Sequence, residues 1–79
     1  MRILVLGIGK IGTTLLKELN RGEGVSELVA ADRNVKWVQH VIKELGSDKI
    51  QAEQIDADDH AQLVNLMRKD FDAVASALL

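Results

Sequence analysis

Residues 2–12 read RILVLGIGKIG, in which an apolar stretch runs into three closely spaced glycines. The apolar part, residues 3–6, predicts a buried strand. After the glycines, Leu15, Leu16 and Leu19 recur at the spacing of the buried face of an amphipathic helix. The glycines therefore occupy the turn between a strand and the helix that follows it.

Each glycine in this turn has a separate physical reason to lack a side chain. Gly7 permits the tight turn out of the strand, Gly9 lets a pyrophosphate approach the backbone, and Gly12 lets the helix pack closely on the sheet. The first N–H groups of the helix and the positive end of its dipole then favour a phosphate. The alternative interpretation is a glycine-rich turn that binds no ligand.

An acidic residue follows the glycines at the spacing typical of a dinucleotide site. Asp32 lies twenty residues after Gly12 and ends a second predicted strand, residues 27–31. A carboxylate there accepts hydrogen bonds from the adenosine ribose hydroxyls and repels a 2′-phosphate, which favours NAD. Arg33 leaves NADP as an alternative, because a guanidinium at that point would stack on adenine or pair with a 2′-phosphate. Asp32 would also serve as a cap for the next helix.

Strand and helix patterns alternate along the rest of the chain. Strands are expected at residues 2–6, 27–31, 49–55 and 72–77, and helices at residues 10–21, at residues 35–45 after an Asn34 cap, and after a cap at Asp58 or Asp59. This alternation predicts an α/β fold, a Rossmann-like doubly wound parallel sheet with strand order 3-2-1-4.

The two predicted edge strands differ in polarity. The third strand contains Gln51, Glu53 and Gln54, which suits a sheet edge. Residues 73–79 carry no charge, and such a strand suits the middle of a sheet. We therefore expect residues 1–79 to form one dinucleotide-binding domain. Either this domain is the N-terminal part of a longer chain, or a second chain covers strand 73–77. A deliberately shortened domain is a third, plainer interpretation. Alone, the chain is expected to self-associate or to be unusually unstable.

Composition narrows the classes of function. The chain has 79 residues, no Cys and a formal net charge of -2. It therefore offers no disulfide, no thiolate metal site and no basic surface for nucleic acid, and no segment suits a membrane span or a signal peptide. A cytoplasmic location is expected. The acidic cluster Asp56, Asp58, Asp59 and His60 is interpreted as helix capping rather than a metal site. No set of catalytic residues is apparent.

Three further segments carry a family resemblance: VSELVAADRN at 25–34, QIDAD at 54–58 and DFDAVASAL at 70–78. With the glycine turn, they resemble the N-terminal nucleotide-binding part of the saccharopine dehydrogenase and lysine-epsilon dehydrogenase family. The resemblance covers the whole chain and implies a cytoplasmic, dimeric oxidoreductase of amino-acid metabolism that uses NAD or NADP. It implies a pyrophosphate at Gly7, Gly9, Lys10, Ile11 and Gly12, the adenosine ribose at Asp32 and Arg33, adenine at Asp56 and Ala57, and the inner ribose near Ser76 and Ala77.

Two functions from different classes follow. The first is the NAD(P)-binding portion of an oxidoreductase, which binds the ADP half of the dinucleotide and catalyses nothing by itself. The second is a nucleotide-sensing regulatory domain, because the GIGKIG motif also resembles the cytoplasmic domains of potassium channels and transporters. The fold alone does not separate them.

Overall fold

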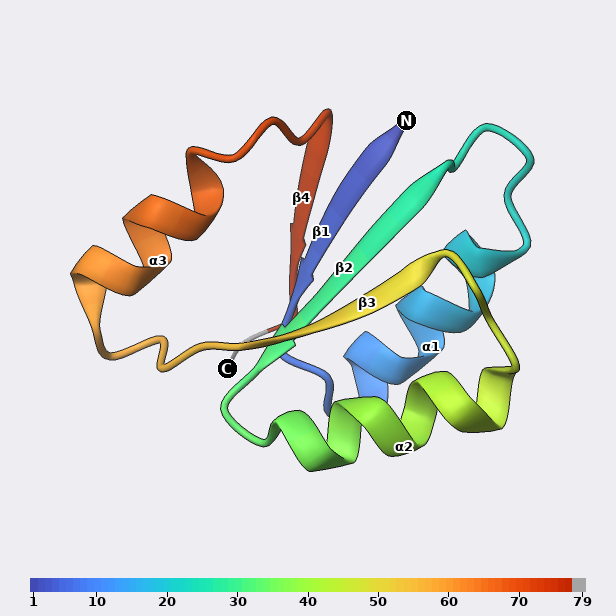
Figure 1. Ribbon diagram of the computed structural model, residues 1–79, viewed down its shortest axis with the longest axis horizontal. Coiled ribbons are helices and arrows are strands. Elements are labelled where there is room, and N and C mark those ends of the chain that lie inside the picture. Colours follow the sequence, from blue (N-terminus) through green and yellow to red (C-terminus); the bar gives the residue numbers. More distant parts are fainter. Residues whose placement is uncertain (78–79) are drawn as a thin grey trace.

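Four parallel strands form a single sheet in the computed structural model, which describes residues 1–77 (Figure 1). The elements are β1 (Arg2–Leu6), α1 (Lys10–Asn20), β2 (Glu27–Asp32), α2 (Val35–Leu45), β3 (Ile50–Gln54), α3 (His60–Met67) and β4 (Ala73–Ser76). The strand order is β3-β2-β1-β4, which confirms the predicted Rossmann-like α/β fold. The predicted boundaries differ from the observed ones by one residue at most, within the usual uncertainty of element ends.

The helices cover both faces of the sheet. Figure 1 shows α1 and α2 together on one face and α3 on the other. Because successive strand residues point to opposite faces, β1 contributes to two separate clusters. Ile3 and Val5 pack with Leu16 and Val38 under α1 and α2, whereas Leu4 and Leu6 pack with Leu66 under α3. The central strand β1 is thus buried from both sides, which fixes the position of the glycine turn that follows it.

Capping residues set where α2 and α3 begin and where α2 ends. The Asn34 side chain accepts a hydrogen bond from the Trp37 N–H (3.1 Å), so Asn34 is the N-cap of α2, as predicted. Gly46 ends α2 in the left-handed conformation, at φ 61°. Asp59, the second of the two predicted candidates, caps α3 by accepting from the Gln62 N–H (3.2 Å). The alternative that Asp32 caps α2 is therefore wrong, because Asn34 occupies that position.

The apolar strand β4 lies at the free edge of the sheet and pairs only with β1 among residues 1–77. Ala73, Val74 and Ser76 are exposed, and Val74 keeps 40% of its surface in contact with solvent. The polar strand β3 forms the opposite edge, as predicted. The folded domain thus leaves an apolar strand, β4, exposed at its edge. No helix within residues 1–77 has both the length and the apolar content needed to cross a membrane.

Candidate functional site

The glycine turn between β1 and α1 has the geometry that the sequence predicts. Gly7 has φ 85°, a conformation that favours glycine. A Cβ atom at Gly12 would overlap the carbonyl oxygen of Gly7, so α1 approaches the turn too closely for any side chain at that position. A Cβ at Gly9 would meet no atom within 4 Å, which leaves open space above the backbone. Gly9 is also the N-cap residue of α1. Because glycine has no side chain to accept hydrogen bonds from the first turn, the first-turn N–H groups remain available to an anion.

Asp32 ties this turn to the end of β2. One carboxylate oxygen accepts a hydrogen bond from the Ile8 N–H (2.6 Å), and the other accepts from the Asn34 N–H (3.0 Å). Each carboxylate oxygen has a second lone pair, so both still have capacity for a ribose hydroxyl. The acid is half-buried and held in one orientation beside the glycine turn.

Trp37 is a residue of this site that sequence reasoning missed. Its indole N–H donates to the Ile8 carbonyl (2.6 Å), so the turn is braced from α2 as well as from β2. Trp37 is 43% exposed, and its indole stacks on the His40 ring with centroids 5.7 Å apart. Its position in the sequence could have indicated this role, because Trp37 lies in the first turn of the helix that begins just after Asp32.

The Arg33 side chain reaches the loop after β3. Its guanidinium donates to the carboxylates of Asp56 (3.2 Å) and Asp58 (3.3 Å), and its carbonyl accepts from the Gln54 side chain (3.4 Å). The hydrogen bond from the Asp58 N–H, followed by that from Arg33, lowers the pKa of Asp56 below its ordinary value. The hydrogen bond to Asp56, with the charges of both carboxylates, raises the pKa of Arg33. Asp56 thus favours its ionised form beside an exposed, permanently charged guanidinium.

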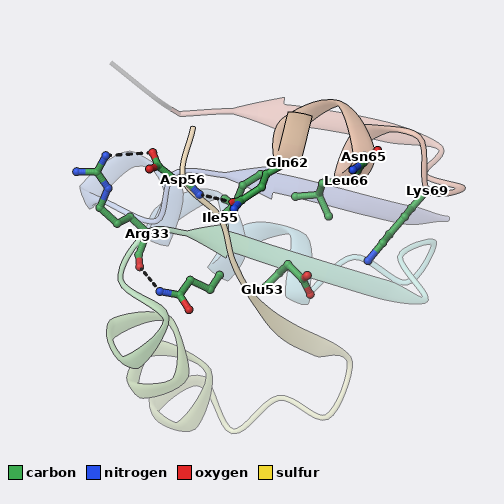
Figure 2. Close-up of a pocket in the computed structure, with 9 residues that line it drawn as sticks. Arg33, Glu53, Ile55, Asp56, Gln62, Asn65, Leu66 and Lys69 are labelled. Carbon is green, nitrogen blue, oxygen red and sulfur yellow. Dashed lines mark hydrogen bonds and ion pairs between the residues drawn. The ribbon is translucent and has the colours of Figure 1, made fainter. Parts of the chain in front are cut away.

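Two hollows flank this ion-paired cluster. The smaller has a volume of about 150 Å³ and adjoins the glycine turn; it is lined by Leu6, Gly7, Ala31, Asp32, Arg33, Ile55, Ala57 and Leu63. The larger, about 710 Å³, is an open groove between β3 and α3, where Figure 2 shows Arg33 and Asp56 at one end and Lys69 at the other. The smaller hollow is the candidate site, because it alone of the two is lined by both the glycine turn and Asp32.

The predicted site residues gather at the carboxyl edge of the sheet. Ala77 lies beside the glycine turn: its N–H donates to the Leu6 carbonyl (2.7 Å), and its Cβ is 3.7 Å from where a Cβ of Gly12 would stand. Ser76 pairs with Leu6 in the β1–β4 register and is exposed. Lys10 and Ile11 are exposed at the start of α1. Within residues 1–77, no group of three or more acidic or histidine side chains is arranged to hold a metal ion.

A parallel sheet of order 3-2-1-4, a glycine turn before the first helix and an acid at the end of the second strand define the Rossmann class of dinucleotide-binding domains. The chain matches the family described as saccharopine dehydrogenase NADP binding domain over residues 3–79. It therefore belongs to that family, as the predicted resemblance implied. The match favours the dehydrogenase-family interpretation over the channel-regulating alternative.

A solved structure shares the fold. The chain is similar to the apo, histidine-tagged saccharopine dehydrogenase (L-Glu forming) from Saccharomyces cerevisiae, with a TM-score of 0.79 and 24% sequence identity. The similarity covers 99% of this chain and 16% of that protein. The chain thus spans about a sixth of the length of the enzyme whose fold it shares.

Proposed function

We propose that the chain binds the ADP half of a nicotinamide dinucleotide across the carboxyl ends of β1 and β2. The observation that carries this proposal is the hydrogen bond from the Ile8 N–H to Asp32, which joins the glycine turn and the strand-end acid into one rigid unit. A pyrophosphate on the free N–H groups of α1 would place the adenosine ribose next to that acid.

The residue roles follow from this placement. Gly7, Gly9, Lys10, Ile11 and Gly12 would surround the pyrophosphate, and Asp32 would accept from the ribose hydroxyls. Asp56 and Ala57 would border the adenine, since Ala57 lines the hollow that Asp32 and Gly7 also line. Ser76 and Ala77 would adjoin the inner ribose, because β4 ends beside the glycine turn.

We further propose NAD as the preferred cofactor. The Arg33 guanidinium is paired with both Asp56 and Asp58, and Asp32 adds a third carboxylate at the ribose end of the site, so this end carries excess negative charge. A 2′-phosphate adds negative charge and is disfavoured there. The family description names NADP, and Arg33 is the side chain that would receive the 2′-phosphate of that cofactor.

The remaining chemistry would belong to a larger protein. We propose that this chain is the nucleotide-binding part of an enzyme that oxidises or forms carbon–nitrogen bonds, as the saccharopine dehydrogenase family suggests. The exposed apolar strand β4 would then be covered by the remainder of that enzyme or by a second chain. The domain supplies binding and orientation, and the hydride chemistry comes from the cofactor.

Calorimetric titration with NAD, ADP-ribose and nicotinamide mononucleotide tests this proposal. ADP-ribose is expected to retain most of the affinity for NAD, and nicotinamide mononucleotide to show no saturable binding. Gly9→Ala should weaken NAD binding at least about tenfold, because a methyl group would occupy the space through which the pyrophosphate approaches. Gly24→Ala is the matched control, since Gly24 also has no atom within 4 Å of an added Cβ. Tighter binding of nicotinamide mononucleotide than of ADP-ribose would contradict the proposal.

A further inference from the structure

Arg33 is the one residue next to Asp32 whose charge suits a 2′-phosphate, yet its guanidinium is already paired. The same Nη2 atom lies 3.2 Å from an Asp56 oxygen and 3.3 Å from an Asp58 oxygen. Figure 2 shows the Arg33–Asp56 contact at the end of the groove between β3 and α3. Both carboxylates belong to the loop after β3, so this loop, rather than β2, determines where the guanidinium points.

A 2′-phosphate therefore meets two obstacles at this site. Arg33 would have to leave its carboxylate partners, and the phosphate would lie near carboxylates that lack a counter-charge once Arg33 has moved. Exposed ion pairs are individually weak, so the arrangement biases the choice of cofactor rather than forbidding one. Ribose hydroxyls require only Asp32, whose position is fixed by Ile8 and Asn34 and not by Arg33.

We propose that Asp58, together with Asp56, is a specificity-determining residue that withholds Arg33 from a 2′-phosphate and so favours NAD over NADP. The inference rests on the proposed dinucleotide site. Asp58 is the informative member of the pair, because its side chain is 90% exposed and its oxygen contacts Arg33. Asp56 has a second role, since the same oxygen accepts from the Asp58 N–H and shapes the turn.

The test compares dissociation constants for NAD and NADP in the protein produced from the complete reading frame, at low ionic strength. Asp58→Asn should tighten NADP binding about two- to fivefold, the scale of one exposed ion pair, and change NAD binding less than about twofold. The gain should shrink in high salt, because salt screens exposed charges. Circular dichroism checks that each variant is folded.

Two further variants separate release of Arg33 from a general change of charge. Asp59→Asn removes the same charge from the same loop and keeps a good N-cap for α3, but the observed partner of Asp59 is Gln62 rather than Arg33. It should leave the NADP-to-NAD ratio near that of the unmodified protein. In an Arg33→Gln background, Asp58→Asn should give no gain in NADP affinity, since the group that receives the phosphate is gone.

The results distinguish failure of this inference from failure of the proposed function. An unchanged ratio in Asp58→Asn overturns the inference and leaves the proposed dinucleotide site intact. An equal gain in Asp59→Asn, or a gain that survives Arg33→Gln, also overturns it in favour of general electrostatics. If the unmodified protein binds neither cofactor, the proposed function fails and this inference fails with it.

Discussion

Ile8 is the residue at which the candidate site is fixed in place. Its side chain is 1% exposed in the core, its N–H donates to Asp32, and its carbonyl accepts from the Trp37 indole. An N–H and a carbonyl that are both bonded leave this peptide little freedom to rotate. The glycine turn is therefore held in one conformation, the one in which we propose that it receives the pyrophosphate.

Trp37→Phe tests the brace from α2. Phenylalanine keeps an aromatic ring but removes the indole donor, so the free energy of unfolding should fall by about 1 kcal/mol, the usual net worth of one hydrogen bond. Urea denaturation followed by circular dichroism measures this change. His40→Ala removes the stacked neighbour and keeps the hydrogen bond, and it should cost clearly less; equal losses in the two variants would contradict the bracing role.

The glycines at 9 and 12 should respond differently to alanine. Gly12→Ala places a methyl group against the Gly7 carbonyl, so overpacking should lower stability by about 1–3 kcal/mol or more. Gly9→Ala meets open space and should cost at most about 1 kcal/mol of helix-cap preference while weakening dinucleotide binding. Thermal denaturation and calorimetry on the same samples separate these effects. Comparable stability losses in both variants would be inconsistent with the observed turn.

Asp56 predicts how the stability of the fold depends on pH. Its pKa is lowered in the folded state, chiefly by the Asp58 N–H and then by Arg33, so it stabilises the fold above about pH 4. This contribution should be lost as pH falls through the lowered folded pKa. The stability difference between the unmodified chain and Asp56→Asn should therefore shrink on acidification, as measured by urea denaturation between pH 7 and pH 3. A carboxyl NMR titration that places Asp56 at or above its ordinary pKa would exclude this account.

At the scale of elements, the main feature to explain is β4, an apolar strand at an exposed sheet edge. The strand is uncharged, pairs with β1 alone within residues 1–77, and leaves Val74 40% exposed. Free apolar strand edges template pairing with other chains. The isolated chain is therefore expected to self-associate through this edge.

Val74→Lys should reduce that self-association, because a charge on an edge strand discourages strand pairing. Sedimentation velocity over a range of concentrations gives the result directly. Met67→Lys is a matched control, since Met67 is 48% exposed but belongs to α3. A monomeric unmodified chain with a cooperative, high melting transition would contradict the expectation, as would an equal effect of both variants.

The features of these elements that depend on local sequence patterns could be predicted from the sequence. The periodicity of apolar residues predicted the strands and helices, and their alternation predicted the strand order. Capping chemistry predicted Asn34 and left Asp58 and Asp59 as candidates for α3, of which the structure selects Asp59. The direction of Arg33 was not predictable, because a long exposed side chain follows whichever charges the tertiary fold brings near. The Trp37 contact was missed for the same reason, since it joins positions that are 29 residues apart.

At the scale of the whole molecule, the carboxyl edge of the sheet gathers the glycine turn, Asp32, the Arg33 cluster and the end of β4. Open parallel sheets bind ligands at this edge. Family membership over residues 3–79 shows a cofactor-binding domain, and the chain spans 16% of the solved enzyme that shares its fold. Cofactor binding is therefore the function that this domain supports by its own residues.

An amide chemical-shift titration of the chain with NAD tests this claim most directly, because it reports the position of binding residue by residue. Saturable shifts are predicted at residues 8–12 and at Asp32, with smaller shifts along the groove between β3 and α3. The same titration with Gly9→Ala should show weakened shifts at the turn. Saturable shifts confined to Gln62, Asn65 and Lys69 of the groove, with the glycine turn unmoved, would contradict the account.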